Sequence, residues 1–279
     1  MNRVKKIVHY DRVWKGKDSV VVVMDTGVEM HPELEGRIWL FRDFINGRAK
    51  EYDDNGHGTH VCGIIGGKQI GIAPECKLIV LKVLDETGNG SVEQSMCAFR
   101  WILENQEKYN IRIVNISMGM VPNRNTQGEK YILGAVDLLW SMGIVVVAAA
   151  GNLGPKVGSI TVPGVSKKIV TVGSYDTIQS GQGSIEKNMR KPDLVAPGQQ
   201  ILSCNAKWNQ KEEKLYVKKS GTSMSTPIVT GAIADLLSKH PNLTNAEVKR
   251  RLASCCTPLQ ISKNRQGNGL LNIKKLLNM

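Results

Sequence analysis

The chain has 279 residues and a formal net charge of +12, from 37 Lys and Arg against 25 Asp and Glu. Hydrophobic residues make up 41% of the chain and charged residues 22%, a balance that excludes an intrinsically disordered protein and allows a sizeable core. The longest uncharged run, residues 138–155, has an apolar centre of only residues 144–150, far short of the roughly 20 residues of a membrane-spanning helix.

Short runs rich in β-branched residues alternate along the chain with longer segments of helical periodicity. In chain order we expect a strand at 19–24, a helix at 57–66, a strand at 77–83, a helix at 91–108, a strand at 111–116, a helix at 128–142, strands at 144–149 and 169–173, and helices at 223–239 and 244–254. This alternation predicts an α/β fold, a three-layer sandwich with a mostly parallel central sheet and helices on both faces. Because no repeat or compositional break divides the chain, we expect a single domain over residues 1–279.

Four segments with small residues follow these strands or begin these helices, where open α/β sheets bind ligands. They carry an acid, a histidine pair, an amide and a serine: Asp25 in Asp-Thr-Gly, His57 and His60 in Asn-Gly-His-Gly-Thr-His, Asn152 in Ala-Gly-Asn, and Ser223 in Gly-Thr-Ser-Met-Ser-Thr-Pro. The four side chains together supply what acyl transfer requires.

Each segment alone allows another interpretation. Asp-Thr-Gly also occurs in aspartic proteases, whose chemistry needs two carboxylates, and a second Asp-Thr-Gly is missing from this sequence, so only a homodimer would supply one. A His-x-x-His pair could hold a metal, but no third ligand stands nearby in the sequence. Ser and Thr before an apolar helix could simply cap it.

The order Asp, His, Ser, with His57–Gly63 and Gly221–Pro227, resembles the subtilisin-like serine proteases, or subtilases. Further matching segments are 25–28 with His31-Pro32, 115–119, 149–152, 192–198 and 237–241, so that the resemblance runs from residue 20 to residue 272. It implies a subtilisin-like fold and a serine endopeptidase. The alternative is a catalytically silent relative that serves as a binding scaffold.

The resemblance implies a role for each polar residue. Ser223 would be the nucleophile, His57 the general base and then acid, and Asp25 the carboxylate that fixes the imidazole tautomer. A serine hydroxyl needs such a hydrogen-bonded base before it attacks. Asn152 would donate its amide, with the N–H of Ser223, to the oxyanion. His60 is expected to be structural.

The resemblance also implies that a peptide substrate binds as an added strand between segment 88–90 and segment 117–119. Glycines in both segments allow the two backbones to approach closely. Met120 stands where a second glycine often follows, and Thr161 and Val162 precede the segment that would close the first specificity pocket. We therefore expect an apolar, somewhat narrowed pocket. The predicted substrate-binding residues are Gly88, Gly90, Ser117, Met118, Gly119, Met120 and Gly164.

Two departures from the secreted members of that family bear on regulation. Those members have a propeptide and a calcium loop, whereas here residues 63–71 are several residues shorter and Glu33 replaces the usual aspartate ligand. We expect no metal site and no other cofactor. Only 24 residues precede Asp25, without a secretory apolar stretch, so we expect no signal peptide or propeptide and a cytoplasmic location. A secreted mature form is the alternative.

The positive charge is compatible with nucleic acid, a membrane surface or an acidic substrate as partner. Basic residues are dispersed in small groups, and aromatic residues, 5% of the chain, do not interleave with them as a base-stacking platform requires. We expect a peptide or protein substrate, no nucleic acid and no membrane, and leave the oligomeric state open. The six cysteines match neither a disulfide scaffold nor a metal site and are expected to be free, buried thiols.

Overall fold

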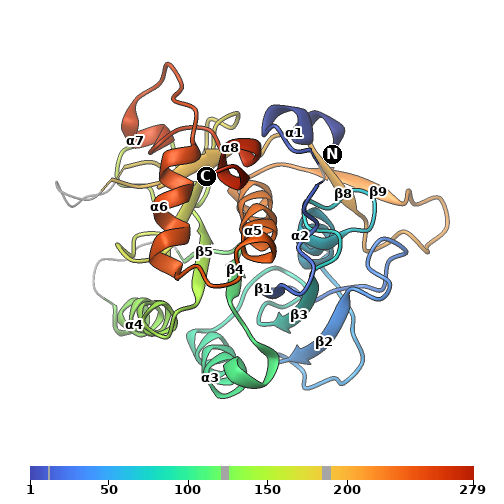
Figure 1. Ribbon diagram of the computed structural model, residues 1–279. Coiled ribbons are helices and arrows are strands. Elements are labelled where there is room, and N and C mark those ends of the chain that lie inside the picture. Colours follow the sequence, from blue (N-terminus) through green and yellow to red (C-terminus); the bar gives the residue numbers. More distant parts are fainter. Residues whose placement is uncertain (12, 121–125, 184–189) are drawn as a thin grey trace.

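The computed structural model describes residues 1–11, 13–120, 126–183 and 190–279. Its strands are β1 (Val20–Asp25), β2 (Ile38–Asp43), β3 (Lys77–Lys82), β4 (Ile113–Ile116), β5 (Val145–Ala149), β6 (Val170–Ser174), β7 (Leu194–Ala196), β8 (Ile201–Cys204) and β9 (Tyr216–Lys219). Within the described residues, β1 to β7 form a sheet in the order β2-β3-β1-β4-β5-β6-β7, in which every neighbouring pair is parallel. Strands β8 and β9 form a separate antiparallel pair (Figure 1).

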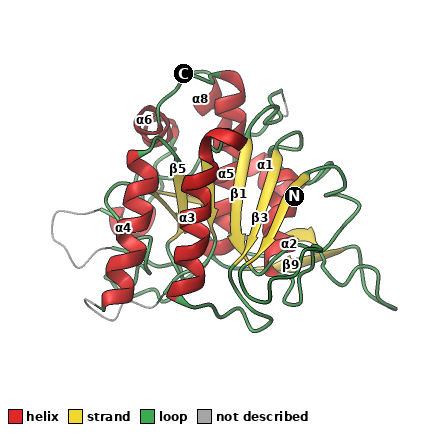
Figure 2. Cartoon of the chain, turned by 90° about the horizontal axis from the view of Figure 1, so that it is seen from below, coloured by secondary structure: helices red, strands yellow, loops and turns green. Residues whose placement is uncertain are grey.

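Helices cover both faces of the large sheet. They are α1 (Asn2–Ile7), α2 (His57–Gly66), α3 (Val92–Tyr109), α4 (Gln127–Ser141), α5 (Thr222–Lys239), α6 (Asn245–Cys255), α7 (Lys263–Gln266) and α8 (Ile273–Leu277). Helices α3 and α4 lie side by side over one face (Figure 2), and α2 and α5 pack on the other. The predicted three-layer α/β architecture is confirmed.

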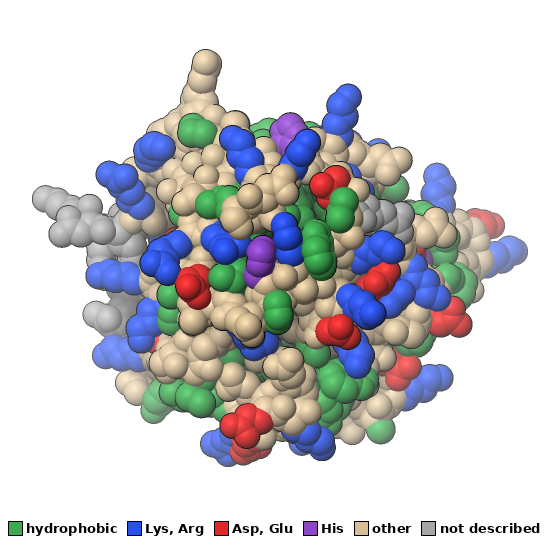
Figure 3. All heavy atoms as spheres, in the orientation of Figure 1, with side chains coloured by type: hydrophobic (Ala, Val, Ile, Leu, Met, Phe, Trp, Pro, Cys, Tyr) green, Lys and Arg blue, Asp and Glu red, His purple; other side chains and the backbone are tan. Residues whose placement is uncertain are grey.

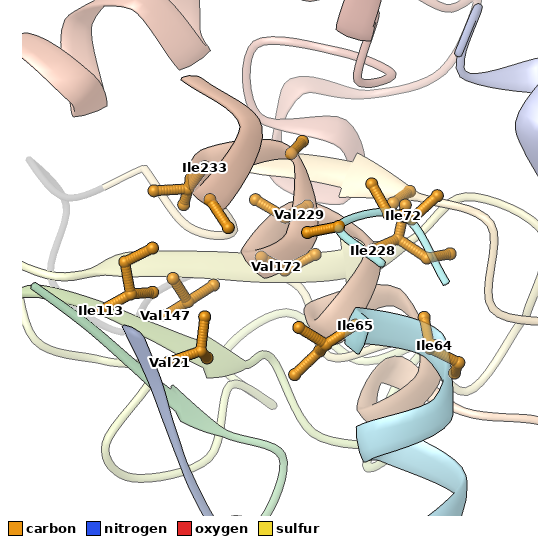
Figure 4. Packing of buried hydrophobic residues seen from close by; sticks show 14 of the residues in the cluster. Val21, Ile64, Ile65, Ile72, Ile113, Val147, Val172, Ile228, Val229 and Ile233 are labelled. Carbon is orange, nitrogen blue, oxygen red and sulfur yellow. The ribbon is translucent and has the colours of Figure 1, made fainter. Parts of the chain in front are cut away.

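Side chains of each central strand point alternately to the two faces, and both faces are buried. In β1, Val21 and Val23 pack with α2 and α5, whereas Val20, Val22 and Met24 pack with α3 and α4. Figure 4 shows the first of these layers, in which strand valines face isoleucines of the two helices. Burial on both faces explains why these strands are near-continuous apolar runs in the sequence.

The ten elements predicted from the sequence are all present, with ends within two residues of the expected ones. The cap predicted for α6 is also present: Thr244 Oγ1 accepts from Glu247 N at 3.2 Å, and Glu247 Oε2 accepts from Thr244 N at 2.8 Å. Strands β2, β7, β8 and β9 and the short helices α1, α7 and α8 are not among the elements predicted from the sequence. Strand β2 lies at the edge of the sheet, where its side chains are only partly buried and its register shifts, so its sequence has neither a clean alternation nor an apolar run.

The strand order reverses at β1. The chain passes from β1 to β2 and β3 on one side of it and then to β4 and β5 on the other. Such a reversal opens a crevice beyond the carboxyl end of the strand where ligands bind in open α/β sheets. Asp25 is the last residue of β1 and therefore lies at this crevice.

Two further expectations are tested by the fold. All six cysteines are free thiols and five are buried as expected, but Cys97 is exposed, so the expectation of a buried thiol is wrong there. In the part of the chain that the structure describes, no helix combines the length and apolarity that crossing a bilayer requires.

Candidate active site

Asp25 and His57 form a hydrogen-bonded pair at the carboxyl end of β1. The Nδ1 atom of His57, the first residue of α2, lies 2.7 Å from Asp25 Oδ1. That same oxygen accepts from Thr26 N at 2.8 Å. Asp25 is fully buried, whereas the His57 side chain is 24% exposed. Because a carboxylate accepts, His57 donates from Nδ1, which leaves Nε2 of the neutral ring as the basic nitrogen.

The surroundings of His57 alter its pKa in opposite directions. Burial by itself lowers the pKa, but the charge of Asp25 and its hydrogen bond raise it, and the net pKa is above the usual value. The ammonium of Lys219 opposes this rise. The imidazolium that forms when His57 takes a proton is therefore stabilised by Asp25.

The start of α2 is held by side chains outside the helix. Asp53 Oδ2 accepts from Thr59 N at 2.8 Å, and Asp53 Oδ1 accepts from Thr26 Oγ1 at 2.8 Å. Thr26 Oγ1 in turn accepts from Gly58 N at 2.9 Å. Gly58 must be glycine, since a Cβ there would lie 2.1 Å from the carbonyl oxygen of Gly27. These hydrogen bonds fix the first turn of α2, which carries His57, against Thr26 and Gly27, the residues that follow β1.

Asn152 is oriented by the residue before Ser223. Asn152 Oδ1 accepts from Thr222 N at 3.0 Å, so that its Nδ2 group is left to donate elsewhere. Thr222 Oγ1 accepts from Gly151 N at 3.1 Å. Gly221 has φ +142°, and a Cβ there would lie 3.2 Å from Asn152 Nδ2. Glycine at 221 therefore allows the close approach of this amide to the start of α5.

Ser223 is the second residue of α5 and is partly exposed. Its N–H has no intrahelical acceptor at this position and contributes to the positive end of the helix dipole. Strand β9 ends at Lys219, four residues earlier in the chain. The ammonium of Lys219 lies 3.9 Å from the position of a Cβ on Gly56, the residue before His57. The starts of α2 and α5 thus adjoin the same short strand.

A cavity of about 530 Å³ adjoins His57. Its apolar wall includes Ile116, Ile132 and Val162, and six of the predicted substrate-binding residues line it: Gly88, Gly90, Ser117, Met118, Gly119 and Met120. Met120 pairs with Val162 as an antiparallel bridge, with N–O distances of 2.8 and 3.0 Å. The segment that contains Ser117 is therefore hydrogen-bonded at Met120 to the backbone around Val162. More of the exposed lining of the cavity is apolar than polar.

Gly164, the seventh predicted substrate-binding residue, does not line this cavity. It is buried, and its carbonyl oxygen accepts from Thr171 Oγ1 at 2.6 Å. Asp25, Asn152 and Ser223 are not among the lining residues either. The first specificity pocket that the sequence predicts around Met118, Met120 and Gly164 thus stays a prediction.

His60 has a different environment from His57. It is fully buried, and its Nε2 lies 3.0 Å from Ile201 O and 3.2 Å from Val217 O. Burial lowers the pKa of His60 to about 3. A neutral ring that donates to the backbone of β8 and β9 agrees with the structural role expected for it.

Glu33 stands where the resemblance implies a calcium ligand in secreted family members. Its carboxylate accepts hydrogen bonds from protein groups. Its Oε2 accepts from Gln69 N at 2.7 Å and Ile70 N at 3.3 Å, and its Oε1 accepts from Tyr216 OH at 2.6 Å. Burial, with the neighbouring Glu33 carboxylate, raises the pKa of Tyr216. The N–H and O–H groups that point at this carboxylate do not suit a cation. Within the described ranges, His, Cys, Asp and Glu side chains do not gather in a group of three or more that could hold a metal.

The sequence analysis missed several polar residues of the site, above all Asp53, Thr26 and Lys219. Asp53 carried one usable signal, an acid three residues before a glycine at a helix start, which is typical of a residue that binds the first N–H groups of a helix. Lys219 carried none, because its approach to Gly56 depends on the pairing of β8 with β9.

Figure 3 shows one face of the surface, on which Lys and Arg side chains are dispersed among other residues and do not form one continuous patch. This distribution matches the dispersal of basic residues in the sequence.

Comparison with known proteins gives consistent matches over most of the chain. Residues 16–269 match the model of the subtilase family. The chain is 37% identical over 282 residues to serine protease AprX of Bacillus subtilis strain 168, a match that covers 90% of this chain but only 64% of AprX. It is 33% identical over 277 residues to Subtilisin Savinase of Lederbergia lenta, covering 98% of this chain and 95% of that protein. Among solved structures, a cold adapted subtilisin-like serine proteinase matches with a TM-score of 0.78 and 31% identity, covering 94% of this chain and 91% of that one.

The environment of Glu33 predicts how stability responds to metal and to mutation. Hydrogen bonds to charged groups are worth about 1.5–3 kcal/mol each, so Glu33→Ala should lower the free energy of unfolding by about 3 kcal/mol or more. Excess calcium and a chelator should give the same melting temperature, whereas a bound ion at a hundredfold excess over Kd would add about 2.7 kcal/mol. Melting is measured by circular dichroism.

Glu35→Ala is the matched control, since the Glu35 side chain is 76% exposed and forms an ion pair with Lys68 at the surface. It should melt close to the parent protein. A clear drop in melting temperature on adding chelator would contradict the interpretation of this loop.

Proposed function

Because the chain belongs to the subtilase family, we propose that it is a serine endopeptidase that works through Asp25, His57 and Ser223. The observation that carries the proposal is the pair in which His57 Nδ1 lies 2.7 Å from Oδ1 of the fully buried Asp25. This bond selects the tautomer whose Nε2 can accept a proton, and it raises the pKa of that base. Histidine held in this way is what a serine nucleophile requires.

The reaction proceeds in two halves. Ser223 Oγ attacks the scissile carbonyl carbon as its proton passes to His57 Nε2, and the carbonyl oxygen becomes an oxyanion. The C–N bond then breaks as His57 Nε2 returns the proton to the leaving amine, and Ser223 keeps the acyl group. Water then attacks the ester carbonyl carbon as it gives a proton to His57 Nε2. The bond between that carbon and Ser223 Oγ breaks as His57 Nε2 returns the proton to Oγ, so that the carboxylic acid product leaves and both residues are restored. Asp25 stays ionised throughout and stabilises the imidazolium.

Two donors are available for the oxyanion. Asn152 uses Oδ1 to accept from Thr222 N, and its Nδ2 group is therefore free to donate. The N–H of Ser223 is the second donor, at the positive end of α5. In a subtilisin, loss of one such side-chain donor costs about 2.7–4 kcal/mol of transition-state stabilisation. We expect Asn152 to matter for kcat more than for KM.

The substrate is a peptide or protein segment bound in extended form. Glycine at 88, 90 and 119 allows a substrate backbone to approach two segments of the cavity that adjoins His57, as strand addition requires. The apolar wall favours an apolar substrate side chain there. That all six cysteines are free supports a reducing compartment such as the cytoplasm, where we propose a processing role.

Labelling with a fluorophosphonate probe tests the nucleophile. The wild-type protein should be labelled at Ser223, whereas Ser223→Ala should be neither labelled nor active, because the substitution removes the proposed nucleophile. Mass spectrometry of the labelled peptide and cleavage of a casein substrate are the measurements. Thr87→Ala, which changes a hydroxyl in the same cavity, is the control and should still be labelled. A wild-type protein that is never labelled and cleaves nothing would instead favour the silent binding scaffold.

The raised pKa of His57 predicts a pH dependence. Protonated His57 cannot act as a base, so kcat/KM should rise with pH through the pKa of the free enzyme, at a value above the ordinary 6.5 of histidine. Asp25→Asn removes the charge that raises this pKa, while burial still lowers it. The rise of kcat/KM with pH should therefore occur at lower pH in this variant. Its kcat should fall about 10⁴-fold, as for the corresponding change in trypsin.

Glu35→Gln, which removes an exposed negative charge, should change neither the pH at which kcat/KM rises nor the value of kcat. If kcat/KM of Asp25→Asn rises at the same pH as in the wild-type protein and kcat is similar, the role given to Asp25 is wrong.

A further inference from the structure

Lys82, the last residue of β3, is a lysine with a completely buried side chain. Its Nζ donates to Thr26 O at 2.6 Å, to Asp54 Oδ1 at 2.7 Å and to Leu84 O at 2.9 Å. An ammonium has three N–H groups, so these acceptors satisfy all of them. The ring of Tyr52 lies beside it, with Nζ 4.8 Å from the ring centroid. Releasing any of the three acceptors would leave a buried charge incompletely solvated, which is costly.

The three acceptors belong to three different parts of the proposed site. Thr26 directly follows the carboxylate of the triad. Asp54 lies in the turn that leads into α2 and its histidine, and its side chain is 33% exposed. Leu84 begins segment 84–90, most of which lines the cavity. One ammonium thus joins the acid, the base and the substrate-binding segment.

Segment 84–90 and the turn before α2 have a second, more exposed connection. Asn55 Nδ2 donates to Glu86 O at 2.9 Å, and Asn55 Oδ1 accepts from His57 N at 3.2 Å. Within the segment, Asp85 Oδ1 accepts from Thr87 N at 2.9 Å. The segment is therefore hydrogen-bonded internally and is joined to the turn before α2 at two points, through Asn55 and through Lys82, and the Lys82 side chain is fully shielded from water. Leu84 N also donates to Asp25 O at 3.3 Å.

We propose that Lys82 is a positioning residue that fixes segment 84–90 relative to the Asp25–His57 pair, so that a peptide bound along this segment presents its scissile bond to the base. The inference rests on the function proposed above. It follows that an extended substrate, which contacts the segment, depends on Lys82 more than a minimal substrate that does not reach it. A general loss of stability would affect both substrates equally.

The test compares two ester substrates with the same acyl residue, one an N-acetyl amino acid ester and the other extended by three residues on the N-terminal side. Lys82→Met keeps the unbranched stem but removes the charge and its donors. Rates are divided by the concentration of active sites, titrated with the fluorophosphonate. The ratio of kcat/KM, extended over minimal, should fall by about tenfold to a hundredfold, since small misplacements of bound substrate have effects of this size.

Lys77→Met is the matched control. Lys77 stands at the other end of the same strand, is exposed, and places its Nζ 4.3 Å from the Trp39 ring centroid. The same substitution there should leave the ratio unchanged. Asp54→Asn is a second variant at the partly exposed partner, which removes the anion without emptying the core, and it should lower the ratio in the same direction. An unchanged ratio in folded Lys82→Met, or in Asp54→Asn where Lys82→Met does not fold, overturns the proposal.

Hydrogen exchange separates this proposal from the proposed function, because it needs no catalysis. In Ser223→Ala, adding Lys82→Met should speed amide exchange in residues 53–59 and 84–90 together, while exchange in β4 and β5 stays at the parent rate. A wild-type protein without activity or labelling would contradict the protease assignment but leave this link testable. Unchanged exchange in both segments would show that Lys82 does not hold them.

Discussion

The arrangement of the site depends on one constraint, the all-parallel sheet whose strand order reverses at β1. Parallel strands need crossover connections, so helices must cover both faces and all the carboxyl ends must share one edge. The reversal separates the connections that leave β1 toward β3 from those that leave toward β4. Asp25 occupies the resulting crevice at the end of a fully buried strand. The start of α5 lies at the same edge, where Ser225 Oγ is 3.1 Å from the carbonyl oxygen of Ala196, the last residue of β7, and 3.1 Å from that of Pro197.

Charges buried at this edge are tolerated because each has specific partners. Asp25 is bonded by His57 and Thr26, Asp53 by the first N–H groups of α2, and Lys82 by three acceptors. Removing one partner from such a group costs far more than the pair contributes, because the remaining charge stays buried. The network therefore makes the geometry of the site specific rather than adding much to stability.

A second buried lysine supports the other side of the crevice. Lys191 Nζ donates to Ile169 O at 2.9 Å, Thr171 Oγ1 at 2.8 Å and Asp193 Oδ2 at 2.7 Å, and burial lowers the pKa of Lys191 to about 8. Thr171 Oγ1 then donates to Gly164 O. An ammonium thus organises backbone on each side of β1, and the carboxylate of Glu33 similarly binds backbone N–H groups at the end of α2. The side chains of Lys82, Lys191 and Glu33 supply the charges that hold these backbone segments.

The sequence by itself determined the α/β class, the ends of the long elements and the identity of the polar residues beside glycine. Those features are local: apolar periodicity marks β1 and α2, and Gly58 and Gly221 are needed where the backbone turns or approaches closely. Only the tertiary structure decided which distant groups meet. Lys82 ends a strand and would be expected to reach solvent, yet its acceptors come from residues 26, 54 and 84. Ile132 of α4 lines the cavity, whereas Gly164 does not and instead accepts a hydrogen bond from Thr171 Oγ1. Contacts between segments far apart in sequence follow from sheet order and helix packing, which no local pattern encodes.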